Sequence, residues 1–297
     1  MTVSVQSLWR RKPPDPTRRT VVVVTDLDGT LFDAETSEAA HAADLLAKRA
    51  VPLVICSSRT RAEIEGLQQK LGVAAPFIAE NGGALFLPRG YFPPWPDVRW
   101  APAYDVIEFG RPYHAVVEAL RVTSRRLGIE VIGFCEMSID EVAAEYGLTL
   151  AEARLAKLRE YDEVFRIVDD DPAVHSRLFR ALHRAGLRCS SRGRYHHATW
   201  ISDRRRTLRT LFSLYRYIAG NVLTVGLADS PCDAWVLEEV EVPIVVQNEA
   251  SGASARLLGK IPTARLTSGA GRQGWSEVIA QVIGSPSLAA QTCQHLS

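Results

Sequence analysis

The residues with the clearest chemical potential are two acids separated by one position, Asp26 and Asp28, which precede Gly29 and Thr30. They follow the β-branched run 21–25, whose lack of polar alternation is typical of a strand buried on both faces of a parallel sheet. Side chains two positions apart in a strand point the same way, and two like charges held close are unfavourable unless a cation or proton transfer compensates. The pattern therefore predicts catalytic carboxylates and a metal site at a strand end.

A second group of acids follows another apolar run late in the chain. The run 221–226 leads to Asp229, and Asp233 lies shortly beyond it. A parallel sheet can place the ends of two such strands side by side although they are distant in sequence. Oxygen ligands without a cluster of His or Cys favour Mg²⁺ over zinc. We therefore expect Asp26, Asp28, Asp229 and Asp233 to form a Mg²⁺ site.

Between these two groups of acids the chain supplies partners for an anion. Ser57, Ser58 and Arg59 follow a second short apolar strand, where the next helix begins with free amides, and Arg204 opens the basic run 204–206. Hydroxyl groups, helix amides and a guanidinium are suited to positioning a phosphoryl group and neutralising its charge. These residues are therefore expected to bind phosphate, with the other two arginines of the run as open alternatives to Arg204.

A sheet must bring these distant residues together. Apolar runs at 52–56 and 77–79 alternate with a helical stretch at 37–49 and with a helix that begins at a capping box of Thr60 and Glu63. Strand and helix in alternation predict a parallel sheet flanked by helices. The expected fold class is therefore α/β, with a Rossmann-like parallel-sheet core.

The pattern changes in the middle of the chain. Residues 88–102 are rich in proline and aromatic residues, which is typical of a crossing between domains, and mixed elements continue to about residue 200. Sheet-like runs then return at 221–226 and 242–246, so we expect a smaller α/β cap domain inserted into the core. The predicted boundaries are a flexible tail at 1–19, core at 20–90, cap at 91–200, core at 201–284 and a flexible tail at 285–297.

Charge and composition exclude several classes of function. The 297 residues include 35 basic and 34 acidic side chains, so the formal net charge of +1 provides no field for nucleic acid or an anionic membrane surface. No apolar stretch has the length of a signal peptide or a membrane span, and five scattered cysteines without a CxxC pair suit a reducing compartment. We expect a soluble, cytoplasmic monomer or homodimer that has neither nucleic-acid nor membrane partners.

Taken together, the run 26–30, the strand-end Ser57, the basic residue before a helix and the late run 229–233 resemble the four motifs of haloacid dehalogenase-like phosphatases. Further segments are similar to the mannosyl-3-phosphoglycerate phosphatases within that superfamily. These segments are 80–83, 108–113, 133–138, 155–163 and 271–275. The resemblance extends over nearly the whole chain, from about residue 21 to about residue 283.

The resemblance implies hydrolysis of a phosphate monoester through an aspartyl-phosphate intermediate. Asp26 would attack phosphorus, while Asp28 would protonate the leaving alcohol and then activate water. The family pattern also implies that Mg²⁺ is held by the Asp26 carboxylate, the Asp28 backbone carbonyl and Asp229, with Asp233 holding metal-bound water or Arg204.

An inserted cap that closes over the sheet end can exclude water and select the leaving group. The expected substrate is a small phosphorylated sugar or a glycosyl glycerate, similar to mannosyl-3-phosphoglycerate. The polar residues expected to contact it are Asn81, Arg159, Glu160, Asp162 and Arg194. We interpret His196 and His197 as surface residues of a strand rather than as ligands.

Three positions depart from the family pattern: Arg204 where lysine is commoner, Ala228 where glycine is commoner, and Cys232 where asparagine is commoner. None of these departures removes a carboxylate, but Cys232 leaves open a weakened or altered metal site, because it lacks an amide that could orient the neighbouring carboxylates. Two other functions therefore stay open. One is a phosphosugar mutase, which would require a bisphosphate activator, and the other is a non-catalytic sugar-phosphate binding protein.

Overall fold

The computed structural model describes residues 19–29, 37–96, 98–202, 204–248 and 252–284. The two predicted flexible tails lie outside these ranges, except for Arg19, and so does Thr30 of the first motif. Within these ranges, every helix is too short or too polar to serve as a membrane span.

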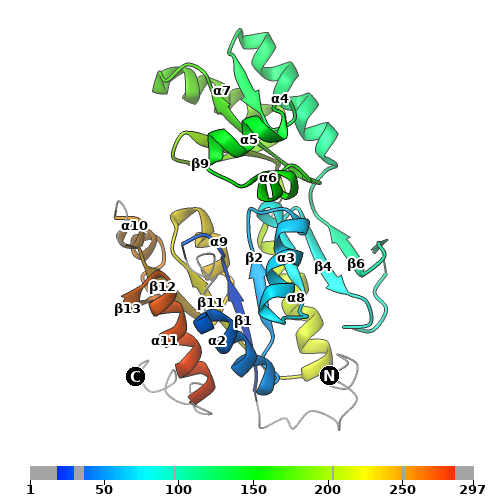
Figure 1. Cartoon of the computed structure of the whole chain (residues 1–297), viewed down its shortest axis with the longest axis vertical. Coiled ribbons are helices and arrows are strands. Elements are labelled where there is room, and N and C mark those ends of the chain that lie inside the picture. The colour runs from blue at the N-terminus through cyan, green and yellow to red at the C-terminus, as the bar shows by residue number, and fades with distance from the viewer. Residues whose placement is uncertain (1–18, 30–36, 97, 203, 249–251, 285–297) are drawn as a thin grey trace.

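A nine-stranded sheet forms the larger part of the molecule, as Figure 1 shows. In spatial order its strands are β13 (Arg265–Ala270), β12 (Val242–Gln247), β11 (Val222–Ala228), β1 (Thr20–Thr25), β2 (Leu53–Cys56), β3 (Phe77–Ala79), β4 (Ala84–Pro88), β6 (Tyr104–Glu108) and β5 (Arg99–Trp100). The six strands from β13 to β3 are parallel, and β4, β6 and β5 pair antiparallel at one edge. The sequence prediction of an α/β fold with a parallel-sheet core is confirmed.

The strand order reverses between β1 and β11. From β1 the chain proceeds to β2 and β3 on one side, whereas from β11 it proceeds to β12 and β13 on the other. In open parallel sheets the crevice at such a reversal, beyond the carboxyl ends of the strands, is the usual place for a ligand. The topology therefore indicates a ligand site at the residues that follow Thr25 and Ala228.

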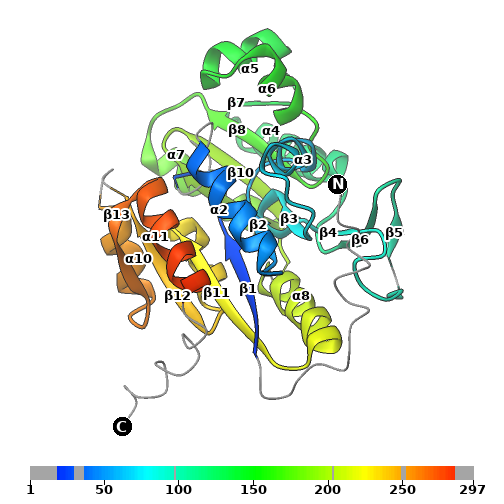
Figure 2. The same ribbon diagram turned by 60° about the horizontal axis from the view of Figure 1, so that its bottom comes forward.

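Helices cover both faces of this sheet because its strands are apolar on both faces. Along β1, Val23 packs in one buried cluster while Val22 and Val24 pack in another. The helices on the Val23 face are α2 (Ser37–Lys48), α3 (Arg61–Leu71) and α11 (Gly271–Gly284). The helices on the other face are α8 (Arg204–Ala219), α9 (Ala234–Leu237) and α10 (Ala253–Lys260). Figure 2 shows α10 and α11 beside β12 and β13.

A smaller antiparallel sheet forms the second part, which lies beyond the carboxyl end of β1 (Figure 1). In spatial order its strands are β7 (Val131–Gly133), β8 (Asp162–Ile167), β10 (Tyr195–Trp200) and β9 (Leu187–Arg192). Its helices are α4 (Tyr113–Leu127), α5 (Ile139–Tyr146), α6 (Leu150–Ala156) and α7 (Pro172–Arg184). Capping boxes at Ser138 and Thr149 start α5 and α6.

Two edge strands of the large sheet indicate where the boundary between core and cap lies. Strands β5 and β6 pair with each other and with β4, although they lie within the segment 91–200 that was predicted to form the cap. A boundary at residue 91 would separate both strands from their sheet. We propose that the cap instead begins near Gly110 and ends near residue 200.

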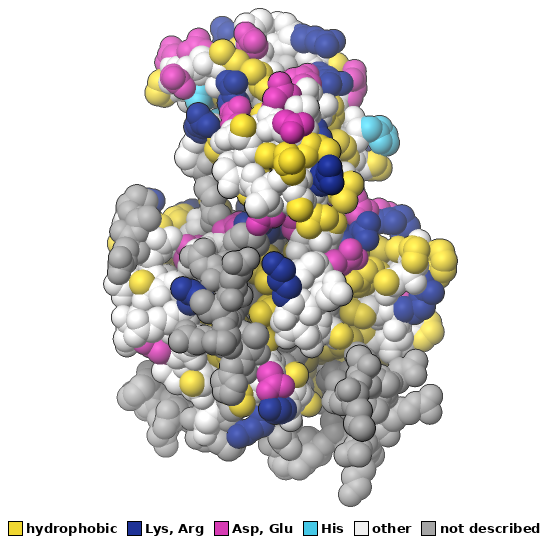
Figure 3. Space-filling model, in the orientation of Figure 1, with side chains coloured by type: hydrophobic (Ala, Val, Ile, Leu, Met, Phe, Trp, Pro, Cys, Tyr) yellow, Lys and Arg dark blue, Asp and Glu magenta, His cyan; other side chains and the backbone are white. Residues whose placement is uncertain are grey.

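Charged side chains connect the two parts. Arg61 of α3 and Arg99 of β5 both form ion pairs with Glu160, just before β8, with nitrogen–oxygen distances of 2.7 and 3.2 Å. Figure 3 shows basic and acidic side chains along this boundary. Because these pairs are partly exposed, each contributes little to stability, but together they restrict how the parts meet.

Candidate active site

Two aspartates meet at the reversal of strand order. Asp26 directly follows β1 and Asp229 directly follows β11, and these strands are paired in parallel register. The Asp26 amide donates to the Leu227 carbonyl at 3.1 Å, and the Asp229 amide donates to Asp26 Oδ2 at 3.3 Å. Both side chains are buried, with 3% and 2% of the residue exposed. Backbone pairing of the two strands therefore sets the relative position of the two carboxylates.

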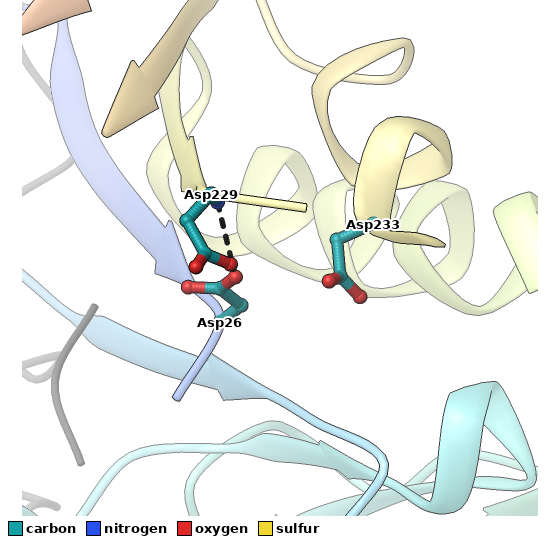
Figure 4. A group of neighbouring side chains, drawn as sticks. All are labelled: Asp26, Asp229 and Asp233. Carbon is teal, nitrogen blue, oxygen red and sulfur yellow. Dashed lines mark hydrogen bonds between the residues drawn. The ribbon is translucent and has the colours of Figure 1, made fainter. Parts of the chain in front are cut away.

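Asp233, from the short turn η2 (Pro231–Asp233), completes a group of three carboxylates, each of which has one oxygen within 4.8 Å of an oxygen of the other two (Figure 4). Two buried carboxylates this close repel each other unless a cation lies between them. Gly29 has φ +84°, and a Cβ there would lie 1.9 Å from Asp229 Oδ2, so only glycine leaves room for this carboxylate. The donor set fits a hard divalent cation such as Mg²⁺.

Asp28 contacts a different partner. Its Oδ1 accepts hydrogen bonds from Arg59 Nε at 3.0 Å and Arg59 Nη2 at 2.8 Å, and Arg59 also pairs with Glu63 at 3.1 Å. Among the described residues, the carboxylate group that could hold a metal does not include Asp28. Arg59 therefore orients Asp28, while a phosphate-binding role for Arg59 and a metal-binding role for Asp28 stay predictions.

The serines after β2 lie at the same sheet end. The Ser57 amide donates to the Ile78 carbonyl at 3.0 Å, and its buried hydroxyl accepts from the Arg59 amide at 3.2 Å. The predicted capping box of Thr60 and Glu63 is present, so part of the first turn of α3 is already capped. Ser57 and Ser58 line the same cavity as Asp26, and their predicted role in binding phosphate stays a prediction.

Arg204 is the first residue of α8 and is partly buried. Its guanidinium carbon lies 5.3 Å from the centre of the Trp235 ring, and its Nε is buried without a hydrogen-bond acceptor among the described residues. Burial and the nearby Arg188 lower the pKa of Arg204. By contrast, Arg205 forms an ion pair with Glu238 at 3.0 Å. Arg206 lies over the Phe109 ring, with its guanidinium carbon 5.9 Å from the ring centre. Arg204 is thus the arginine of the run with a buried nitrogen that lacks an acceptor in the described part of the chain, but it lines neither of the cavities described below, and its role in binding phosphate stays a prediction.

Two adjoining cavities open at this end of the sheet. The smaller, of about 30 Å³, is lined by Asp26, Leu27, Asp28, Cys56, Ser57, Ser58, Asn81, Ser190, Ser191, His197, Cys232 and Asp233. The larger, of about 480 Å³, is lined by Asp28, Gly29, Ser191, Gly193, Asp229, Ser230, Pro231, Cys232, Asn248, Ala253 and Arg256. Burial, with the nearby Asp233 and Asp26 carboxylates, raises the pKa of Cys56, which keeps this thiol protonated. Asp26 is therefore the better nucleophile in the smaller cavity.

Asn81, predicted to contact the substrate, lines the smaller cavity and joins the large sheet to the cap. Its amide donates to Asp162 Oδ2 at 2.8 Å, and the same oxygen accepts from His197 Nδ1 at 2.8 Å. Asp162 is fully buried and lines neither cavity. The expectation that His196 and His197 lie on a strand surface is wrong. His196 is buried with 3% of the residue exposed, and His197 lines the smaller cavity.

Two further predicted cap residues, Arg159 and Glu160, lie at the contact between the two parts. Glu80 accepts hydrogen bonds from the consecutive backbone amides of Glu160, Tyr161 and Asp162 at 2.7–3.1 Å. Arg159 is buried and donates to the carbonyls of Ser58 at 2.8 Å and Asp162 at 2.8 Å. Arg159 and Glu160 line neither cavity, so the structure gives them a role in holding the cap against the core.

Arg194 lies farther away. It is exposed, its Nε donates to the Tyr195 hydroxyl at 2.8 Å, and the same guanidinium reaches the Glu145 carbonyl. It lines neither cavity. Its predicted contact with substrate is not supported by this arrangement and stays a prediction.

Several residues of the site have no motif in the sequence. Ser190 and Ser191 come from β9, which was not among the predicted strands, and His197 comes from β10. Asn248, just beyond β12, donates to Asp229 Oδ2 at 2.5 Å. A polar residue at the end of a predicted parallel strand was the available signal for Asn248, whereas no sequence signal distinguishes the two serines.

Comparisons with known proteins agree with this geometry. Residues 23–88 match the family model of haloacid dehalogenase-like hydrolases. The glucosyl-3-phosphoglycerate/mannosyl-3-phosphoglycerate phosphatase of Methanococcoides burtonii is 36% identical over 89% of this chain and 97% of that protein. The enzyme of the same name from Persephonella marina is 31% identical over 89% of this chain and 97% of that protein.

Solved structures share the fold at low identity. A haloacid dehalogenase-like hydrolase from Bacteroides thetaiotaomicron has a TM-score of 0.61 at 15% identity, covering 89% of this chain and all of that one. The sucrose-phosphatase of Synechocystis sp. PCC6803 has a TM-score of 0.56 at 14% identity, covering 90% of this chain and 98% of that one. With the curated relatives, these findings show that this chain is a phosphoric monoester hydrolase belonging to the haloacid dehalogenase-like phosphatases.

Proposed function

We propose that this enzyme hydrolyses the phosphate monoester of glucosyl-3-phosphoglycerate or mannosyl-3-phosphoglycerate, with Mg²⁺ as its cofactor. The observation that carries the proposal is the pair of buried carboxylates, Asp26 and Asp229, at the sheet end where Asp26 and Ser57 line the smaller cavity and Asp229 lines the larger one. The names of the curated relatives support the substrate class.

The residues at the cavity support covalent catalysis. The Asp26 carboxylate would attack phosphorus, the bond from phosphorus to the leaving oxygen would break, and Asp28 would give its proton to that oxygen. Asp28 would then take a proton from water as the water attacks phosphorus, which releases phosphate and restores the Asp26 carboxylate. Arg59 supports this role because it holds Asp28 in one orientation.

Asp26, Asp229 and Asp233 would hold the cation, which supplies charge neutralisation between the carboxylate nucleophile and the anionic phosphate. Ser57 would hydrogen-bond a phosphate oxygen, and Arg204 would add positive charge near Asp233 and Cys56. Both residues would therefore position the phosphoryl group rather than transfer a proton.

Phosphate release from a panel of esters tests the proposal. The panel contains both glycosyl-3-phosphoglycerates, 3-phosphoglycerate, glucose 6-phosphate and mannose 6-phosphate, each with Mg²⁺ and with a chelator. We expect the highest kcat/KM for the glycosyl-3-phosphoglycerates and loss of activity with the chelator. Release from neither glycosyl-3-phosphoglycerate would contradict the proposal, and activity only after a bisphosphate is added would identify a mutase instead.

A further inference from the structure

His197 lies in the middle of β10, opposite Ser190 of β9 and Val164 of β8. Directly paired residues of antiparallel strands share a face of the sheet, so His197 and Ser190 project together, and both line the smaller cavity. The neighbouring His196 packs against Phe165 and Phe179 instead. Strand alternation thus directs one of the two adjacent histidines to the catalytic cavity.

The orientation of the His197 ring is held from both parts of the molecule. Asp162 and Asn81 meet at one oxygen, Asp162 Oδ2, to which His197 Nδ1 lies at 2.8 Å. Burial raises the pKa of Asp162, but the Arg159 guanidinium and His197 together lower it by more. The net shift of the pKa is therefore downward, and the group is a carboxylate. A carboxylate can only accept, so Nδ1 carries the proton that it donates. The second nitrogen, Nε2, has no hydrogen-bond partner among the described residues.

The lining of the smaller cavity indicates which ligand groups would meet this nitrogen. Its cap side is formed by Ser190, Ser191 and His197, and the Ser191 hydroxyl lies 2.8 Å from His196 Nδ1. No aromatic carbocycle among the described residues lines this cavity. In phosphoryl transfer the attacking and leaving oxygens lie roughly in line. With Asp26 as the attacking group on the core side, the leaving group must therefore face Ser190, Ser191 and His197.

We propose that His197 is a specificity-determining residue, whose Nε2 hydrogen-bonds a hydroxyl of a polyhydroxylated leaving group, while Asp162 and Asn81 hold the imidazole in place. This inference rests on the proposed phosphatase function and adds the residue that recognises the leaving alcohol of the phosphate ester. A site built to hydrogen-bond a substrate hydroxyl discriminates strongly against analogues that lack it, because its own polar group is then left unpaired.

Two substitutions separate the nitrogens of the ring. His197→Asn keeps a donor near the position of Nδ1 and removes Nε2, whereas His197→Gln keeps a polar group near Nε2 and removes the donor to Asp162. The control is His183→Asn, which changes an exposed histidine in the last turn of α7. Each protein is assayed with the best glycosyl-3-phosphoglycerate and with p-nitrophenyl phosphate, whose leaving group has no further hydroxyl.

For the glycosyl ester, His197→Asn should lower kcat/KM by about 10- to 100-fold, and His197→Gln by less. For p-nitrophenyl phosphate both variants and the control should stay within about threefold of the unchanged enzyme. The ratio of the two kcat/KM values is the deciding quantity, because a general folding defect would lower both alike and leave the ratio unchanged.

An unchanged ratio in His197→Asn would overturn this inference. The proposed function fails differently, because the unchanged enzyme would then release no phosphate from any glycosyl ester. In that case the ratio is measured with the best sugar phosphate of the panel, so the role of His197 is still decided.

Discussion

The two walls of the candidate active site are built in different ways. On the core wall, Asp26, Ser57 and Asp229 each follow directly after a parallel strand, so backbone pairing places them. On the cap wall, Ser190 and His197 lie within antiparallel strands, and side-chain hydrogen bonds to the core hold the wall in position. The comparison teaches that the residues proposed to carry the reaction are placed by sheet topology, whereas those proposed to select the leaving group depend on a separate side-chain network that can change independently.

The largest expected effect lies on the core wall. Asp26→Asn removes the nucleophile and should lower kcat by about 10⁴-fold or more for every substrate. Steady-state phosphate release measures this effect, and Asp44→Asn is the control because that aspartate is exposed on α2. Asp26→Asn with activity near that of the control would show that the core wall does not carry the chemistry.

The next prediction tests whether the backbone of the core wall at Gly29 affects the affinity for Mg²⁺. In Gly29→Ala the new Cβ would collide with Asp229 Oδ2, so we expect the Mg²⁺ concentration for half-maximal activity to rise by about 10-fold or more, since carboxylate placement sets affinity. Titration of activity with Mg²⁺ measures this shift.

Gly72→Ala is the matched control for this substitution. Gly72 also has a positive φ, +66°, but a Cβ added there would meet no atom within 4 Å. Both variants carry a similar backbone cost of about 1 kcal/mol, so only the collision with Asp229 differs. If the two variants require the same Mg²⁺ concentration for half-maximal activity, the space that Gly29 leaves for Asp229 does not affect the metal site.

A smaller effect concerns the contact that holds the cap wall. Burial is the largest cause that raises the pKa of Glu80, from 4.5 to about 7, and the nearby Asp162 adds to it, although Arg159 opposes it. Because the unfolded chain releases this proton at lower pH than the folded chain, the contribution of Glu80 to stability is full below its unfolded pKa and is lost as pH rises through the folded value.

Glu80→Gln removes this titration. Between about pH 5 and about pH 8, the free energy of unfolding of the unchanged enzyme should therefore fall relative to that of the variant. Urea unfolding at several pH values measures both. Parallel pH profiles would show that Glu80 does not titrate in this range and that the cap contact is insensitive to pH.

The smallest expected effect concerns Arg194, which lies in the cap but lines neither cavity. Arg194→Ala should change kcat/KM for glycosyl esters by less than about twofold, because exposed side chains away from a site contribute little and the contacts of Arg194 are with Tyr195 and Glu145. Comparison of kcat/KM with that of the unchanged enzyme checks this. A loss of about 10-fold or more would restore the substrate contact that the sequence analysis expected.

What could be predicted from sequence follows the same division. Buried parallel strands appear as continuous apolar runs, and their carboxyl ends are therefore visible in the sequence, which is why Asp26, Ser57 and Asp229 were found. Strand β9 was not predicted because its residues, Leu187–Arg192, are mostly polar and lie in the small sheet. Without that strand, neither the serines of the cap wall nor the direction of His197 could be inferred.

The sequence by itself therefore determined the parallel sheet, the acids at its strand ends and the phosphatase family. Only the tertiary structure decided that Arg59 holds Asp28, that Glu80 and Arg159 hold the cap, and that Asp162 orients His197. The physical reason is that strand ends are set by local pattern and backbone pairing. The cap wall, by contrast, depends on side-chain contacts between segments far apart in the chain, whose partners are defined only when both parts are folded and packed together.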